Sequence, residues 1–171
     1  LGRAINTARL ILANNSEKKK PEIIELIGLR EWGYGGYEGR DDNDLWIPLY
    51  KEVNVKFEKD WSTWDEFTSK MDDKAIADAI AKNDSTKTAE TYDQILIRSK
   101  AAMDQIIEEA TAIGGGKVLV VSHGSEIPTI LEMYAPDEYN GEAIGNVSLS
   151  ILEYQNGKFT LKTIGNLDYL K

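Results

Sequence analysis

Apolar residues recur every three or four positions in two stretches of the chain, a spacing typical of amphipathic helices. In residues 4–13 the apolar positions are Ile5, Ala8, Ile11 and Leu12. In residues 92–113 they are Tyr92, Ile95, Leu96, Met103, Ile106, Ile107, Ala110 and Ile113. Thr91 and Gln94 stand at the beginning of the second stretch with the spacing of a capping box, and the glycines at 114–116 favour its end. We therefore expect a short helix near the start of the sequence and a long helix in its middle.

Other segments carry the patterns of strands and turns. Residues 23–29 are rich in Ile and Leu, and residues 117–122 contain an apolar run, as expected of parallel strands covered on both faces. Ser125 is a candidate N-cap for a helix that follows the second strand. Residues 147–151 alternate between apolar and polar, and Asn156-Gly157 is a type I′ hairpin signal. These patterns predict two buried parallel strands, a further helix and a C-terminal hairpin.

Residues 42–88 differ in composition from the segments on either side. They are rich in charge, show no strand-like alternation and contain the Trp and Phe residues Trp46, Phe57, Trp61, Trp64 and Phe67. Within them Ala75, Ile76, Ala79 and Ile80 form one helical stripe. We expect a helical cap inserted at 42–88 into a single domain over residues 1–171. The predicted fold class is α/β: a mostly parallel sheet flanked by helices on both faces, with this cap and a C-terminal edge hairpin.

The composition narrows the classes of function. The 171 residues include 20 Lys and Arg against 29 Asp and Glu, a formal charge of −9, which argues against nucleic acid or an acidic membrane surface as partner. With no Cys and one His, the sequence excludes disulfides, thiolate metal sites and multi-histidine metal centres. No apolar run approaches the roughly 18 residues of a membrane span. We therefore expect no metal and no cofactor.

The one histidine, His123, is the clearest candidate for chemistry. It stands where the predicted strand 117–122 ends and the next helix begins, and open α/β sheets bind ligands at such strand ends. Free N–H groups and the dipole at a helix N-terminus favour phosphate or another anion there. The alternative is that His123 only caps the turn.

Two further charged residues are candidates for the same site. Glu31 follows the first predicted strand and precedes a glycine-rich turn, from which its carboxyl group could enter the crevice and act as a general acid. Arg3 stands at the start of the first helix, where a planar guanidinium can offer phosphate two N–H groups. Considered singly, a surface Glu beside a turn and a solvated Arg remain open alternatives.

Four short motifs follow one another along the chain. They are Arg3-Ala4 with Thr7-Ala8, then Leu29-Arg30-Glu31 with Gly35-Gly36 and Glu38-Gly39, then Val120-Val121-Ser122-His123-Gly124, and finally Asn146-Val147-Ser148. In this order they resemble the motifs of the histidine phosphatase superfamily, also called the phosphoglycerate mutase-like family. The resemblance extends over essentially the whole chain.

The resemblance implies a phosphomonoesterase or phosphomutase that works through a phosphohistidine without metal. It implies Glu31 and His123 as catalytic residues, with Glu31 the proton donor to the leaving alcohol. Arg3, His123 and the backbone at Gly124 and Ser125 are implied to bind the phosphoryl group. The expected partner is a small phosphoester or inorganic phosphate, with no nucleic acid and no membrane, and a homodimer is left open.

The family's nucleophile belongs to an Arg-His-Gly motif on the first strand of the sheet, and the sequence from Leu1 onward contains no such motif. We expect this strand and its nucleophile to lie upstream of the chain. The chain by itself should therefore have no catalytic activity. An upstream targeting signal is left open too, with a cytoplasmic location as the default. Because Arg40-Asp41-Asp42-Asn43-Asp44 stands where the mutases carry Asn-Lys, a phosphatase is favoured over a mutase. A noncatalytic phospho-ligand-binding domain and an unrelated α/β domain are the remaining alternatives.

Overall fold

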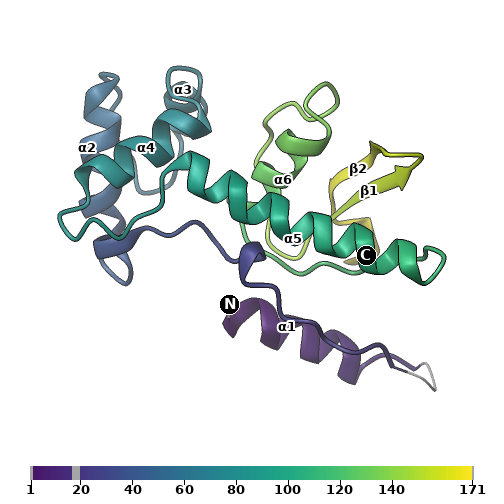
Figure 1. Ribbon diagram of the computed structural model, residues 1–171. Coiled ribbons are helices and arrows are strands. Elements are labelled where there is room, and N and C mark those ends of the chain that lie inside the picture. The colour runs from purple at the N-terminus through teal and green to yellow at the C-terminus, as the bar shows by residue number, and fades with distance from the viewer. Residues whose placement is uncertain (1, 17–19, 171) are drawn as a thin grey trace. The chain divides into compact units, whose positions relative to one another are not determined.

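The computed structural model describes residues 2–16 and 20–170, and the chain divides into two compact units (Figure 1). The middle unit is Trp32–Ile97, and the terminal unit combines Leu1–Glu31 with Arg98–Lys171. The predicted 42–88 insertion lies inside the middle unit.

The middle unit contains the helices α2 (Asp42–Glu52), α3 (Trp64–Thr68) and α4 (Asp73–Asn83), together with a 3₁₀ turn at Gly35–Tyr37. The two longer helices begin after aspartates whose carboxylates accept hydrogen bonds from the first turn. Asp41 accepts from the N–H of Asn43 at 2.9 Å, and Asp72 accepts from the N–H of Ala75 at 2.8 Å. These side chains satisfy donors that a helix N-terminus otherwise leaves unpaired.

Aromatic and aliphatic side chains form the core of the middle unit. Phe67 is fully buried, and its ring stacks on that of Tyr50 with centroids 4.1 Å apart. Ile76 and Ile80, from the stripe predicted on α4, are each 2% exposed. The helical character predicted for residues 42–88 is confirmed, and the aromatic residues that suggested it pack mainly against one another.

The terminal unit contains α1 (Gly2–Ala13), most of α5 (Tyr92–Ala112) and α6 (Glu126–Tyr134), with 3₁₀ turns at Ile27–Leu29 and Asp168–Leu170. The predicted capping box at the start of α5, which belongs to the middle unit, is present: the N–H of Thr91 donates to Gln94 Oε1, and the N–H of Gln94 donates to Thr91 Oγ1. The predicted stop at the glycines is confirmed, since Gly114 and Gly115 have φ of 86° and 87°. No helix in the described part of the chain is long and apolar enough to cross a membrane.

The C-terminal hairpin forms as predicted. Strands β1 (Leu149–Gln155) and β2 (Lys158–Asn166) pair antiparallel, with Gln155 opposite Lys158 across the turn. Asn156 and Gly157 have φ of 52° and 80°, as a type I′ turn requires. The hairpin packs on α6, where the rings of Tyr134 and Phe159 lie 4.6 Å apart.

The predicted, mostly parallel sheet is not confirmed. Over the described ranges the only sheet is the β1–β2 hairpin, and neither residues 23–29 nor residues 117–122 form a strand. A strand needs a hydrogen-bonded neighbour, and an apolar run indicates a preference for burial without supplying that neighbour. Val118, Leu119 and Val120 are accordingly 54%, 59% and 38% exposed, where the pattern predicted burial.

Candidate functional site

The carboxyl group of Glu31 lies at the N-terminus of α6. Its Oε1 accepts hydrogen bonds from the N–H groups of Ser125 and Glu126, at 3.2 and 3.1 Å. A helix start has N–H groups without partners in the helix, and a carboxylate also interacts favourably with the helix dipole there. Ser125 occupies the N-cap position but makes no capping bond through its side chain. Glu31 therefore caps α6 in the place that the sequence assigned to Ser125.

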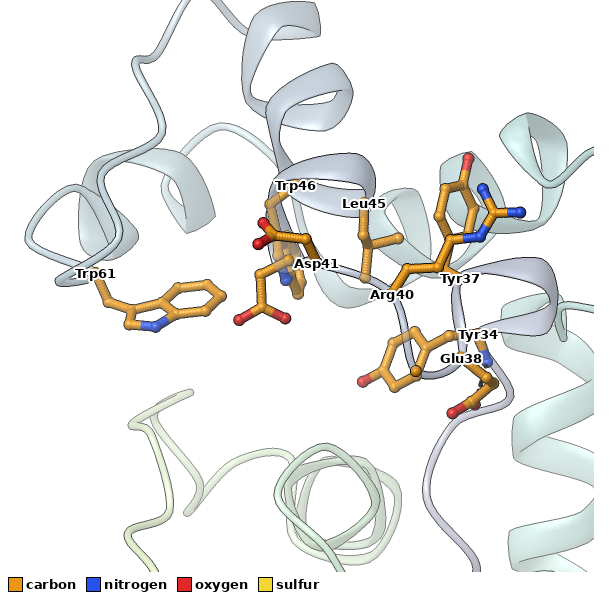
Figure 2. A pocket seen from close by; sticks show the side chains of 10 residues that line it. Tyr34, Tyr37, Glu38, Arg40, Asp41, Leu45, Trp46 and Trp61 are labelled. Atoms are coloured by element: carbon orange, nitrogen blue, oxygen red, sulfur yellow. Dashed lines mark hydrogen bonds between the residues drawn. The ribbon is translucent and has the colours of Figure 1, made fainter.

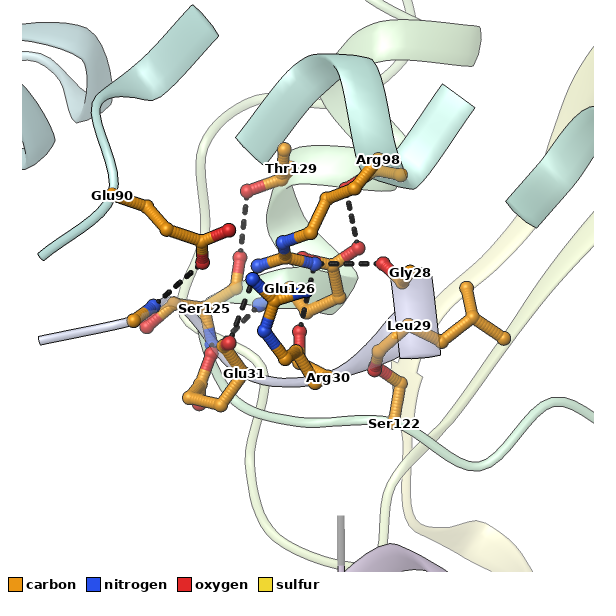
Figure 3. A network of polar contacts seen from close by, with 12 residues as sticks. Gly28, Leu29, Arg30, Glu31, Glu90, Arg98, Ser122, Ser125, Glu126 and Thr129 are labelled. Carbon is orange, nitrogen blue, oxygen red and sulfur yellow. Dashed lines mark hydrogen bonds and ion pairs between the residues drawn. The ribbon is translucent and has the colours of Figure 1, made fainter. Parts of the chain in front are cut away.

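The guanidinium of Arg98, on α5, holds the backbone that carries Glu31 (Figure 3). Its Nη1 donates to the carbonyl oxygens of Gly28 and Arg30 at 2.7 and 3.0 Å, and its Nη2 donates to the carbonyl oxygen of Glu31 at 3.2 Å. The segment approaches α5 closely because residue 28 is glycine. A Cβ there would collide with the backbone oxygen of Arg98.

Glu126, at the start of α6, is the most deeply buried charged side chain of this network, with 0% exposure. Its Oε2 lies 2.9 Å from Arg98 Nη1, and its Oε1 accepts from the Ser99 hydroxyl at 2.6 Å. Burial raises the pKa of Glu126 to about 7, although the bonds from Ser99 and Arg98 oppose the change. This carboxyl group therefore changes its protonation near neutral pH.

His123 precedes α6, and its carbonyl oxygen accepts the N–H of Ile127 in the first turn. Its Nε2 is buried and finds no hydrogen-bond partner in the described ranges. Burial lowers the pKa of His123 below its ordinary value; the carboxylate of Glu31 raises it, and the charges of Arg3 and Arg98 lower it further. A buried imidazole nitrogen without a partner, near both acidic and basic groups, is suited to binding an oxyanion.

Some of the residues predicted to form the site are in direct contact in the structure, and others are not. Glu31 and Ser125 are in direct contact, and a Cβ on Gly124 would lie 3.9 Å from Glu31 Oε2. Arg3 is exposed in the first turn of α1, and its charge reaches His123 without a hydrogen bond to it in the described residues. The start of α6 thus gathers Glu31, Gly124 and Ser125 next to His123, while Arg3 acts over a longer distance.

The middle unit has a polar centre of its own at Asp84, which is 1% exposed. Its carboxylate accepts hydrogen bonds from four backbone N–H groups, those of Gly36, Thr86, Thr88 and Ala89, at distances between 2.8 and 3.1 Å. Burial raises the pKa of Asp84, but these hydrogen bonds outweigh burial and hold it well below its usual range. Because every partner lies in the same unit, Asp84 fixes the glycine turn that precedes α2.

A pocket of about 330 Å³ opens beside this turn in the middle unit (Figure 2). Aromatic and acidic side chains line it, including Tyr34, Trp46, Trp61 and Glu38. Glu38, a motif residue, accepts a hydrogen bond from the N–H of Tyr34 and thereby closes the turn.

Sequence reasoning missed Arg98 and the buried role of Glu126. Arg98 looks like any surface Arg of an amphipathic helix, because its partners are backbone oxygens about 70 positions away in the chain. Glu126 was not among the residues predicted to form the site. The one available signal was an acidic residue in the first turn of a helix whose remaining residues are mostly apolar.

Comparison with known proteins assigns the chain to a family. The family model of the histidine phosphatase superfamily (branch 1) matches residues 1–167. A crystal structure of phosphoglycerate mutase from Bacillus anthracis str. Sterne is similar, with a TM-score of 0.84 and 34% sequence identity over 99% of this chain and 70% of that one. No curated protein matches the chain. The α/β fold and the family resemblance are thus confirmed, and the chain belongs to the histidine phosphatase superfamily.

Proposed function

We propose that this chain carries most of the site of a phosphomonoester hydrolase that acts on a small phosphorylated molecule through a phosphohistidine. Family membership supports phosphoryl transfer as the reaction class. The observation that carries the proposal is the contact of Glu31 with the α6 N-terminus directly after His123. An acid, an imidazole and helix N–H groups at one turn are the parts that phosphoryl transfer needs for positioning and charge stabilisation.

Glu31 is the proposed general acid and base. As the phosphorus–oxygen bond of the ester breaks, the carboxyl group of Glu31 gives its proton to the leaving alcohol. In the second half of the reaction the Glu31 carboxylate removes a proton from water, which attacks the phosphohistidine and releases inorganic phosphate. General acid–base assistance of this kind contributes about 10²- to 10⁴-fold in rate.

His123, Arg3 and the α6 turn are the proposed phosphoryl-binding groups. The buried Nε2 of His123 supplies a hydrogen bond to a phosphoryl oxygen, and Arg3 supplies positive charge. Gly124 and Ser125 offer backbone N–H groups, of which that of Ser125 is also bonded to Glu31. These donors stabilise the charge that develops on the transferring group.

The proposal requires a second imidazole as nucleophile, because His123 is the only His in the 171 residues. We place that nucleophile outside this sequence. The mechanism uses no metal and no cofactor, since the acid, the nucleophile and the oxyanion donors are all supplied by side chains and backbone.

A phosphomutase is the second candidate, favoured by the likeness to a phosphoglycerate mutase. In a mutase the Glu31 carboxylate would remove a proton from a substrate hydroxyl in place of water. The phosphoryl group would then return to the substrate at that hydroxyl. Incubation with 3-phosphoglycerate, followed by ³¹P NMR, separates the two candidates. A hydrolase releases inorganic phosphate, whereas a mutase forms 2-phosphoglycerate.

Hydrolysis of p-nitrophenyl phosphate tests the main proposal, with the protein expressed from its complete coding sequence. We expect His123→Ala to lower kcat/KM by about 10³-fold, as for loss of a main oxyanion donor. Exposed Glu132→Gln, on the far end of α6, is the matched control and should leave the rate unchanged. Absence of hydrolysis and of mutase activity, with phosphate still bound, would instead establish a noncatalytic binding domain.

A further inference from the structure

The network around Arg98 joins two parts of the terminal unit that are distant in sequence. One guanidinium contacts three backbone carbonyl oxygens of the segment 28–31 and, at the same time, the carboxyl group of Glu126 (Figure 3). The Arg98 side chain is 11% exposed, and that of Glu126 is 0% exposed. Neither residue has a part in the chemistry proposed above.

We propose that Arg98 and Glu126 are positioning residues for Glu31: they fix the backbone on which its carboxyl group is held at the start of α6. The inference rests on the proposed function in giving Glu31 a catalytic role. Arg98 fixes the carbonyl oxygens that flank Glu31, and Glu126 fixes the guanidinium from the opposite side.

The geometry requires arginine at position 98. A planar guanidinium presents several N–H groups in fixed directions, which allows it to serve carbonyl oxygens and a carboxylate together. A lysine ammonium is a compact point charge and cannot reach the four acceptors from one position. Arg98→Lys therefore keeps the charge near His123 and removes the multiple contacts.

Glu126 connects the guanidinium to the helix that Glu31 caps. The N–H of Glu126 donates to Glu31, while its side chain contacts Arg98 and Ser99. Glu31 is thus held twice by the same residue pair, through its own carbonyl oxygen and through its carboxyl group. An error of about 1 Å in the placement of an acid can cost 10²-fold in rate, so such a double restraint has a catalytic consequence.

Amide hydrogen exchange measures the positioning without any turnover. The N–H groups of Ser125 and Glu126 are bonded to Glu31, whereas those of Ile127 and Thr129, in the same helix, are bonded to backbone oxygens. In Arg98→Lys we expect the protection factors of the first pair to fall about tenfold and those of the second pair to stay within twofold. Lys100→Arg, an exposed residue of α5 paired with Asp104, is the matched control and should change neither pair.

Glu126→Gln provides a second, conservative variant. Its amide keeps an oxygen for Arg98 and an N–H for Ser99, so the fold is retained without the negative charge. Because the wild-type Glu126 is ionised above pH 7, the two proteins are compared at pH 8, where we expect a selective loss of protection at Ser125 and residue 126 that is smaller than in Arg98→Lys. An equal loss at all four amides would show that Arg98 has a merely structural role and would overturn the proposal, as would no loss in Arg98→Lys.

Dependence on the leaving group tests the catalytic consequence. A poor leaving group, such as that of a simple alkyl phosphate, needs a well-placed acid, and p-nitrophenolate needs one much less. In Arg98→Lys we expect kcat/KM to fall about tenfold for the alkyl ester and less than twofold for p-nitrophenyl phosphate. Equal losses for both esters would contradict positioning of the acid. If the wild-type protein hydrolyses neither ester, the proposed function fails, and the amide measurement still decides the positioning.

Discussion

The two units of the molecule are stabilised by different means. The middle unit buries a cluster of aromatic and aliphatic side chains, in which Phe67 and Tyr50 stack face to face. The terminal unit contains a polar network, in which Arg98, Glu126 and Glu31 join α5, α6 and the segment 28–31. Many apolar side chains of the terminal unit are exposed, Val118 and Leu119 among them.

The two kinds of contact suit different purposes, one the stability of a unit and the other the placement of reacting groups. Apolar packing is nondirectional and tolerates exchange among side chains of similar size, which suits a unit whose role is to keep its shape. Hydrogen bonds to a guanidinium or a carboxylate fix atoms in direction as well as distance. A site that must place an acid beside an imidazole is therefore built from the second kind of contact. All four Trp residues lie in the middle unit and the one His lies in the terminal unit, so each unit has its own spectroscopic probe.

The largest effect on stability is expected in the apolar core of the middle unit. Phe67→Ala removes a fully buried ring and its stacking on Tyr50, which should lower the free energy of unfolding by about 3–5 kcal/mol. Urea unfolding followed by Trp fluorescence measures this loss. A loss under about 1 kcal/mol would mean that the aromatic cluster does not hold the unit together.

Asp84 is a buried charged residue in the middle unit, whose core is otherwise mostly apolar. Asp84→Ala leaves four partly buried N–H groups without this acceptor, so we expect the thermal midpoint to fall by about 5 °C or more. The pKa of Asp84 is held low in the folded state, so its ionised form stabilises the protein above the unfolded pKa and loses this effect as pH falls through the folded pKa. The gap between wild type and Asp84→Asn should therefore narrow in strong acid, and a gap independent of pH would contradict the account.

For Glu126 we expect the opposite dependence of stability on pH. Its pKa is raised to about 7, so the folded state favours the neutral carboxyl group. The resulting stability is present below the unfolded pKa of about 4.3 and is lost as pH rises through about 7. Glu126→Gln should thus gain stability relative to wild type between pH 5 and pH 8, by on the order of 2 kcal/mol. Chemical denaturation of both proteins at several pH values, followed by the His123 resonance, measures this; a constant difference would contradict the raised pKa.

The smallest effect is expected at the exposed apolar residues of the terminal unit. Val118 is 54% exposed, so Val118→Thr in the 171-residue chain should change the free energy of unfolding by less than about 0.5 kcal/mol. A loss above about 1 kcal/mol would show that residues 117–122 are buried after all, as the sequence pattern predicted. Ile130→Thr, at a position 6% exposed in the same unit, is the control that should destabilise clearly.

Helices and the hairpin could be predicted from the sequence because their signals are local. The capping box at Thr91 and Gln94 and the turn at Asn156-Gly157 lie within a few residues of the structure that they specify. Residues 117–122 were misassigned because a strand depends on a neighbour that local sequence does not provide. The apolar run there indicated only a preference of the side chains for burial.

The candidate site could be predicted only in part for the same reason. Glu31 and His123 were recognised from their places after apolar segments and from their motifs. The cap that Glu31 provides for α6 and the contacts of Arg98 join residues between about 65 and 95 positions apart, and no local pattern encodes them. The charge of Arg98 also gave no indication that its partners are carbonyl oxygens.

The most direct test of the account is a titration of the sole imidazole with inorganic phosphate, followed by ¹⁵N NMR at a series of pH values. In the proposed site an oxyanion lies against His123, and a bound phosphate dianion favours the charged imidazole. We predict saturable shifts of the His123 resonances and a rise of its pKa when phosphate binds, both weakened in Arg3→Gln and unchanged in Arg9→Gln. His123 resonances and a His123 pKa that do not respond to phosphate would contradict the account.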